Sequence, residues 1–181
     1  KISYLFPRAH AVAYVMMAFR IAWFKVYHPL AFYAAYFSIR AKAFDLRIMT
    51  GDLKTQMTEF NRIKALDRAA SPKDKDLMSA LEVSMEMYQR GYRFVNVDIQ
   101  HSEARRFSIK DGALLPPFLA IDSLGETVAD AIVAEREERP FTSLKDLQRR
   151  CKVSNTIIDL MKELKCCGEL PEDEQMSLFG A

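Results

Sequence analysis

The chain has 181 residues, of which 50% are apolar and 28% charged, and this composition excludes a disordered or collagen-like protein. Its 3 cysteines include no C-x-x-C pair, which argues against a disulfide scaffold and a four-ligand zinc site. The net charge is only +2, but residues 1–47 carry +6 and residues 169–181 carry −4, so we expect a polyanionic partner for the first segment and a different partner for the last.

The first predicted element is a helix over residues 9–27, which is apolar on almost all sides and therefore expected to be buried. Pro29 ends it and suits the first turn of a second helix over residues 30–40. Arg20 and Lys25 interrupt the apolar segment, which argues against a membrane span, so we expect no membrane partner. Unpaired cysteines agree with the reducing environment of a cytoplasmic protein.

Further helices are predicted over residues 49–69 and 73–90, the second of them capped by Ser71 and stopped by Gly91. The hydrophobic period then changes, which predicts short strands over residues 93–99 and 106–109.

Helices follow again over residues 127–138, 143–150 and 155–166, and residues 171–181 are expected to form a flexible tail. The predicted fold class is therefore mainly α with a small β element.

Residues 120–129 fit the pattern apolar–apolar–x–x–apolar–Gly–x–x–x–Ala of a helix–hairpin–helix. We expect Gly125 to supply the backbone angle of the tight turn, and the next helix to begin with N–H groups that bind a phosphate without reading a base. Ser123 stands where the motif usually has glycine, and Glu126 places a negative charge beside the phosphate. An ordinary glycine-capped turn is the alternative. The predicted DNA-binding residues are Ser123, Leu124, Gly125 and Thr127.

We find no repeat of 20–50 residues in the chain. Whether residues 141–164, which contain two more short helices, form a second and degenerate hairpin unit is left open.

Arg8, His10 and Tyr14 lie near the start of the first predicted helix, with Tyr14 one turn beyond His10 on the same face. A cation, an imidazole and an aromatic ring so placed can hold a triphosphate and stack a base. The alternative is that Tyr14 belongs to the core and that His10 is a buried, hydrogen-bonded residue.

The acidic tail ends in a short apolar segment whose exposure to water is unfavourable unless a partner binds it. Gln175 can donate hydrogen bonds while Met176, Leu178 and Phe179 enter an apolar pocket on that partner.

These pieces occur in an order that resembles the bacterial C-family replicative DNA polymerases of the PolC type, over essentially the whole chain. Three segments resemble the fingers of that family: residues 6–14 (FPRAHAVAY), 22–29 (AWFKVYHP) and 32–35 (FYAA). Five further segments resemble the carboxyl end of its alpha subunit: residues 86–92 (EMYQRGY), 115–118 (LPPF), 124–129 (LGETVA), 168–171 (GELP) and 175–179 (QMSLF). The family often has Ser where this chain has Ala9, a position that carries no predicted role.

The resemblance implies three parts: a fingers fragment over residues 1–92, a duplex-DNA-binding domain with a helix–hairpin–helix over 93–168, and an acidic tail with a sliding-clamp-binding peptide over 169–181. It implies that the parent protein is a DNA-directed DNA polymerase, a nucleotidyltransferase, whose partners are primer–template duplex DNA, dNTP, the sliding clamp and other replisome subunits. Arg8, His10 and Tyr14 would contact the incoming nucleotide.

In the family, Mg2+ is held by palm aspartates, and the chain has none of the motifs that carry them. We therefore expect no catalytic residue and no metal ligand in this chain, and no polymerisation by it alone. One alternative is a non-catalytic helix–hairpin–helix DNA-binding or repair module that binds the clamp, which would explain residues 115–181. Another is a peripheral membrane protein that uses the basic, aromatic first segment.

Overall fold

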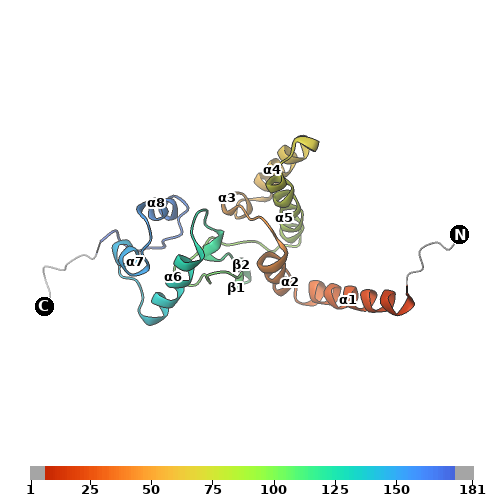
Figure 1. The fold of residues 1–181 in the computed structure, drawn as a ribbon, viewed down its shortest axis with the longest axis horizontal. Coiled ribbons are helices and arrows are strands. Elements are labelled where there is room, and N and C mark those ends of the chain that lie inside the picture. Colours follow the sequence, from red (N-terminus) through yellow and green to blue (C-terminus); the bar gives the residue numbers. More distant parts are fainter. Residues whose placement is uncertain (1–6, 174–181) are drawn as a thin grey trace.

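The computed structural model describes residues 7–173, and these form a helical protein with one small antiparallel sheet, as the sequence predicts (Figure 1). The elements are α1 (Arg8–Tyr27), α2 (Pro29–Ala35), the π-helix η1 (Tyr36–Arg40), α3 (Leu46–Met49), α4 (Leu53–Ala65), the 3-10 helix η2 (Asp67–Ala69), α5 (Pro72–Gln89), β1 (Ser108–Lys110), β2 (Ala113–Leu115), the 3-10 helix η3 (Phe118–Ala120), α6 (Glu126–Glu138), α7 (Leu144–Cys151) and α8 (Asn155–Glu163).

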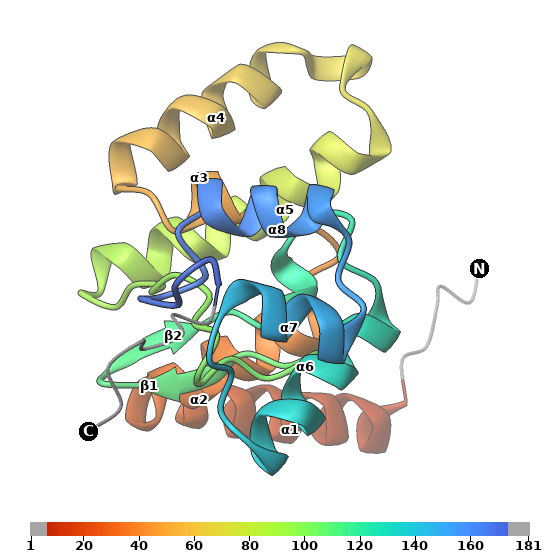
Figure 2. The ribbon, with the colours of Figure 1, turned by 90° about the vertical axis from the view of Figure 1, so that its left-hand side faces the viewer.

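The buried apolar side chains form two cores. The first lies among α2, α4, α5 and the sheet, with Tyr33 and Leu81 fully buried. The second lies among α6, α7 and α8, which Figure 2 views from their side of the molecule, and Ile132 and Leu147 are fully buried in it. The two cores occupy different ends of the molecule, and α1 extends away from the end that holds α2 (Figure 1). The domain boundary predicted between residues 92 and 93 stays a prediction.

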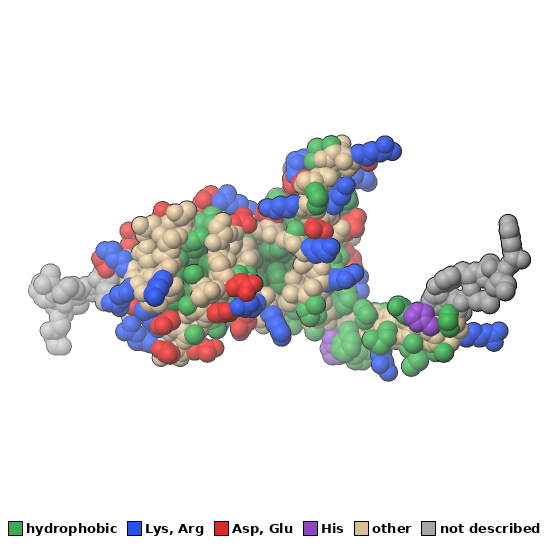
Figure 3. Space-filling view, viewed as in Figure 1, with side chains coloured by type: hydrophobic (Ala, Val, Ile, Leu, Met, Phe, Trp, Pro, Cys, Tyr) green, Lys and Arg blue, Asp and Glu red, His purple; other side chains and the backbone are tan. Residues whose placement is uncertain are grey.

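The bounds of α1 agree with the predicted helix, but its predicted burial is wrong for the described residues. No residue of α1 is buried, and Phe19 is 72% exposed. Apolar side chains cover the projecting helix (Figure 3). By length and apolar composition, α1 is also a helix that could cross a membrane.

Polar contacts join the carboxyl-terminal end of α1 to α2 and α5. Lys25 forms a 2.6 Å ion pair with Glu86 of α5. Arg90 donates one hydrogen bond to the Lys25 carbonyl oxygen at 2.8 Å and another to the Tyr33 hydroxyl at 3.0 Å. These contacts hold the elbow between α1 and α2 against the end of α5.

The predicted helix over residues 49–69 is divided, because Asp52 begins a new helix. Its carboxylate accepts a hydrogen bond from the Thr55 N–H at 2.8 Å, which caps α4. The predicted start and stop of α5 are confirmed: Ser71 and Asp74 form a capping box, and Gly91 takes a positive φ of 85° directly after the cap residue Arg90.

A buried polar cluster joins α4 to α5. Gln56 is fully buried, and its amide donates to the Met49 carbonyl oxygen at 3.1 Å and accepts from the Ser84 hydroxyl at 2.6 Å. The Tyr88 hydroxyl donates to the same Met49 carbonyl at 2.8 Å. These bonds satisfy the polar atoms in the first core and fix the register of the two helices.

The predicted strand over residues 93–99 does not form; only Phe94 makes an isolated parallel bridge, to Leu114. Asn96 ends the pairing, because its side chain accepts from the Val97 N–H at 2.9 Å, which a strand would have used. The strand predicted over residues 106–109 is found as β1. Its partner β2 was missed because all its residues are buried, so its sequence shows no alternation.

The predicted helices of the second core are confirmed, except that α8 ends at Glu163 instead of Cys166, and Lys165 has a positive φ of 57°. The flexible tail expected from residue 171 is wrong for residues 171–173, which bind α7 and α8. The predicted clamp peptide, Gln175, Met176, Leu178 and Phe179, lies outside the described residues.

Candidate nucleic-acid interface

The predicted hairpin lies between η3 and α6, and its tip is open to solvent. Ser123, Gly125 and Thr127 are exposed. Leu124 is only 5% exposed because its side chain belongs to the second core. A DNA-binding role for Leu124 can therefore use its backbone alone.

The unusual backbone angle belongs to Ser123 and not to Gly125. Ser123 has a φ of +64°, in the left-handed region that favours glycine. Gly125 has ordinary extended angles, φ −75° and ψ 156°, so the prediction that it supplies the turn angle is wrong. A Cβ atom built on Gly125 would meet no atom within 4 Å. Because Gly125 has no side chain, the space beside the amino-terminal end of α6 is open to a ligand.

The amino-terminal end of α6 presents unused hydrogen-bond donors. Across residues 7–173, no group accepts a hydrogen bond from the backbone N–H of Gly125, Glu126 or Thr127, and no side chain caps the helix. These donors and the helix dipole together favour an anion such as a phosphate oxygen.

Arg105 balances the acidic side chains on the first turns of α6. Its guanidinium contacts the Glu126 carboxylate at 2.5 Å and the Asp130 carboxylate at 3.1 Å. These hydrogen bonds lower the pKa of Asp130. The negative charge of Glu126 beside the hairpin is thus paired with a cation.

A second hairpin lies between α7 and α8 and repeats the backbone of the first at a distance of 29 residues. Lys152 has a φ of +54° and corresponds to Ser123. Val153 is 3% exposed and corresponds to Leu124. Ser154 caps α8 with φ −71° and ψ 156°, almost the angles of Gly125. The two hairpins therefore form a backbone repeat that the sequence does not show, and residues 141–164, which the sequence left open, contain the second hairpin.

The second hairpin also has an exposed tip. Its Lys152 side chain is exposed, and within the described part of the chain no acceptor meets the N–H groups of Asn155 and Thr156. The sequence signal for this unit was weak: Thr156 matches Thr127 and Asp159 matches Asp130, but the glycine is replaced by Ser154.

The predicted nucleotide contacts lie at the free end of α1, far from the hairpins (Figure 1). The rings of His10 and Tyr14 stack edge to face with 4.3 Å between their centroids, so they share a face as predicted. Tyr14 is 65% exposed, which excludes the core position considered for it. Arg8 is exposed and lies two residues before His10, a spacing that does not place the two on one helix face.

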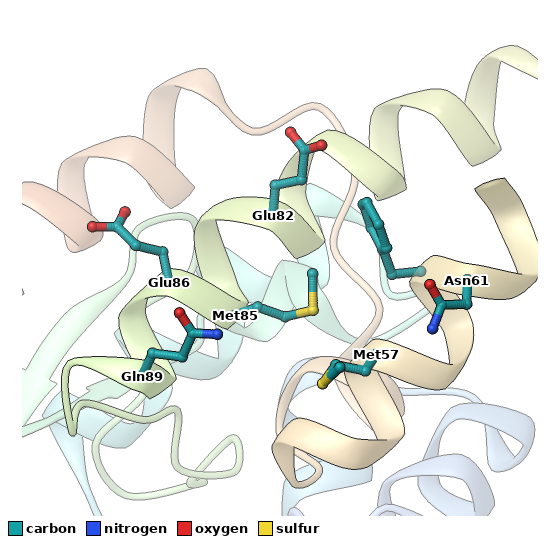
Figure 4. A pocket seen from close by; sticks show the side chains of 7 residues that line it. Met57, Asn61, Glu82, Met85, Glu86 and Gln89 are labelled. Carbon is teal, nitrogen blue, oxygen red and sulfur yellow. The ribbon is translucent and has the colours of Figure 1, made fainter.

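A cavity of 310 Å³ lies between α4 and α5 (Figure 4). Met57, Phe60 and Met85 supply apolar lining, while Glu82 and Glu86 supply carboxylates. Glu86 is paired with Lys25, but Glu82 adds negative charge and the lining contains no cation, so the cavity does not favour a triphosphate or a nucleic acid.

In the described ranges, no three His, Cys, Asp or Glu side chains gather in a way that could hold a metal ion. All three cysteines are buried, and burial raises the pKa of Cys151 to about 11 and that of Cys166 to about 12.

Comparison with known proteins places both hairpins in one recognised motif. Residues 91–175 match the family described as "Helix-hairpin-helix motif". A protein named "DNA polymerase III PolC-type" from Caldanaerobacter subterraneus subsp. tengcongensis is 48% identical over 179 residues, covering 99% of this chain and 13% of that protein. Proteins of the same name from Streptococcus suis and Streptococcus pyogenes serotype M12 are 49% and 47% identical over 182 residues, covering 99% of this chain and 12% of each relative.

Proposed function

This chain is a member of the PolC-type DNA polymerase III family, homologous to its carboxyl-terminal part, and we propose that it provides the polymerase's grip on duplex DNA. The chain spans about an eighth of the length of the relatives it matches, so the polymerase activity itself is proposed for the parent protein.

The observation that carries the proposal is the repeated hairpin. Two exposed helix starts, at Gly125 and Ser154, each offer unpaired N–H groups, and Lys152 adds a cation at the second. Such donors contact phosphate oxygens without reading bases, as a replicative enzyme requires. We expect non-specific binding with a Kd on the order of 10 µM at physiological salt, weakening as salt rises.

Gly125→Val tests this grip. The valine side chain would occupy the space where a phosphate must approach, although the backbone angles at this position permit it. Duplex affinity should fall about tenfold, since hydrogen bonds to a charged group contribute about 1.5 kcal/mol. Fluorescence anisotropy with a labelled duplex measures the affinity, and thermal unfolding checks that the variant keeps the stability of the unchanged chain.

Ser79→Val, an exposed substitution on α5, is the matched control and should change neither quantity. If Gly125→Val folds normally and binds DNA as tightly as the unchanged chain, the hairpin is not part of the grip.

We also propose that residues 1–92 belong to the fingers, with Arg8, His10 and Tyr14 facing the incoming dNTP. The exposed ring pair and the basic charge of this segment support that role. Mg2+ does not fit the side chains described in this chain, since no suitable ligand cluster exists among them, and we place it in the remainder of a cytoplasmic polymerase. The chain alone should polymerise nothing, and primer extension by it would contradict this assignment.

Attachment to the sliding clamp through Gln175, Met176, Leu178 and Phe179 is proposed from the sequence pattern. In the complete polymerase, Leu178→Ala with Phe179→Ala should reduce processivity far more than single-nucleotide incorporation, because a tether raises local concentration without changing the chemistry. Primer extension under single-encounter conditions, with and without the clamp, measures both. Equal losses in the two quantities would count against the clamp role.

The alternative of a repair module explained only residues 115–181. The PolC-type relatives match 99% of the chain, including α1 and α2, and so favour the polymerase.

A further inference from the structure

The helix α7 differs from α6 and α8 in that its own chain fills its amino-terminal end. The Leu144 N–H donates to the Pro171 carbonyl oxygen at 2.8 Å, and the Lys145 N–H donates to the Glu172 carbonyl oxygen at 3.2 Å. The Asp146 N–H donates to the Ser143 hydroxyl at 3.1 Å. The donors that are open on the two hairpin helices are therefore satisfied here.

Side-chain charges reinforce the same contact. Glu172 forms a 2.7 Å ion pair with Lys162 of α8, and Asp173 pairs with Lys145 of α7. Leu170 packs against the second core just before these residues. Residues 171–173 thus cross from one helix to the other, held by backbone and side-chain contacts on both.

We propose that the first turn of α7 and Lys162 form a docking site for an acidic peptide, and that residues 171–173 occupy it as a strap that fixes where the carboxyl-terminal residues leave the domain. The inference rests on the proposed clamp attachment only for what residues 174–181 bind. The last residue held by the domain is then Asp173, two positions before Gln175, so the link between the domain and the proposed clamp peptide is short.

The strap also has a defined place relative to the hairpins. It binds the Ser143 end of α7, whereas the second hairpin tip follows the Cys151 end, about 12 Å away along an eight-residue helix. A clamp bound to the tail and a duplex bound to the hairpin tip would therefore be attached at opposite ends of α7.

Amide hydrogen exchange followed by NMR tests the strap in the chain as it is. The Leu144 and Lys145 amides should be protected, although the first amides of a helix are ordinarily open to solvent. Glu172→Lys should speed their exchange about fivefold, because it replaces an exposed ion pair with a like-charge contact. Adding Lys162→Glu to that variant should restore protection by reversing the pair.

Glu169→Lys is the matched control, since it makes the same charge change at an exposed residue for which no ion pair is seen in the described chain, and it should leave both amides protected. Unprotected Leu144 and Lys145 amides in the unchanged chain, or no effect of Glu172→Lys, would overturn the strap.

Adding purified sliding clamp separates this proposal from the clamp role. Continued protection of the two amides in the clamp complex supports a strap that positions the tail, and loss of protection on binding overturns that positioning. A clamp that does not bind at all contradicts clamp attachment, while the amide measurements still decide the strap.

Discussion

Ser123 holds a left-handed backbone conformation at the tip of the first hairpin, and Lys152 holds the same conformation at the second. Such angles are unfavourable for a residue with a Cβ atom, and natural turns usually place glycine there. The sequence pattern correctly located the turn, but it assigned the strained angle to the one glycine present. Gly125 instead has no side chain before the first turn of α6, where a Cβ atom would point into open space.

Ser123→Gly should stabilise the chain by about 0.5 kcal/mol, the difference between the relieved left-handed strain and the greater chain entropy of glycine. Urea unfolding would measure the gain. Duplex affinity should stay within about twofold, because non-specific phosphate contacts at the tip use backbone N–H groups. A destabilised variant would show that the Ser123 side chain matters to the turn.

At the scale of the elements, α7 carries a buried charged side chain, Asp146, which is surrounded by arginines. The Asp146 carboxylate is fully buried and accepts from Arg149 at 2.8 Å and from the Thr142 N–H at 3.3 Å. Arg139 and Arg150 each approach it within 3.3 Å. Burial opposes ionisation, but the hydrogen bonds from Arg149 and Thr142 outweigh it and lower the pKa of Asp146.

Asp146→Asn should destabilise the chain by about 1.5 kcal/mol at neutral pH, because the buried acceptor loses charged hydrogen bonds while Arg139 and Arg149 stay 58% and 71% exposed. Because the folded pKa lies below the ordinary value of 3.8, the carboxylate stabilises above that value and loses its effect as pH falls through the folded pKa. Urea unfolding of both chains at neutral and strongly acid pH checks this. An undiminished difference in acid would contradict the ionic origin.

The elements with strong local signals were predictable, and those that depend on distant contacts were not. Ser71, Ser143 and Ser154 begin helices because each side chain accepts a hydrogen bond from the helix's first turn. The strand expected over residues 93–99 failed because the Asn96 side chain competes for the backbone, and β2 was missed because both its faces are buried. At the site, the first hairpin was predicted and the second was left open, since Ser154 stands in place of glycine.

At the scale of the whole molecule, α1 is the feature that the described chain leaves uncovered. Its large apolar side chains are between 48% and 72% exposed, and they are Val12, Tyr14, Val15, Met16, Met17, Phe19, Ile21, Trp23, Phe24, Val26 and Tyr27. So large an apolar surface ordinarily marks an interface.

Removing residues 1–28 should reduce self-association of the chain, because the exposed apolar surface of α1 favours association. Duplex affinity should stay within about twofold, because the hairpins lie elsewhere. Sedimentation velocity and anisotropy measure the two properties. Cosedimentation of the full chain with anionic vesicles examines the membrane alternative. A marked loss of DNA affinity on removal would instead place α1 in the duplex interface.

The single turn α3 ties the two cores together. Leu46 is buried in the second core and Met49, three residues later, in the first, so one rigid turn has an end in each. Twisting one half of the molecule against the other would pull a large side chain into water, at about 2 kcal/mol. A movement of the end that holds α2 and α5 is therefore transmitted through α3 to the end that holds α6, α7 and α8.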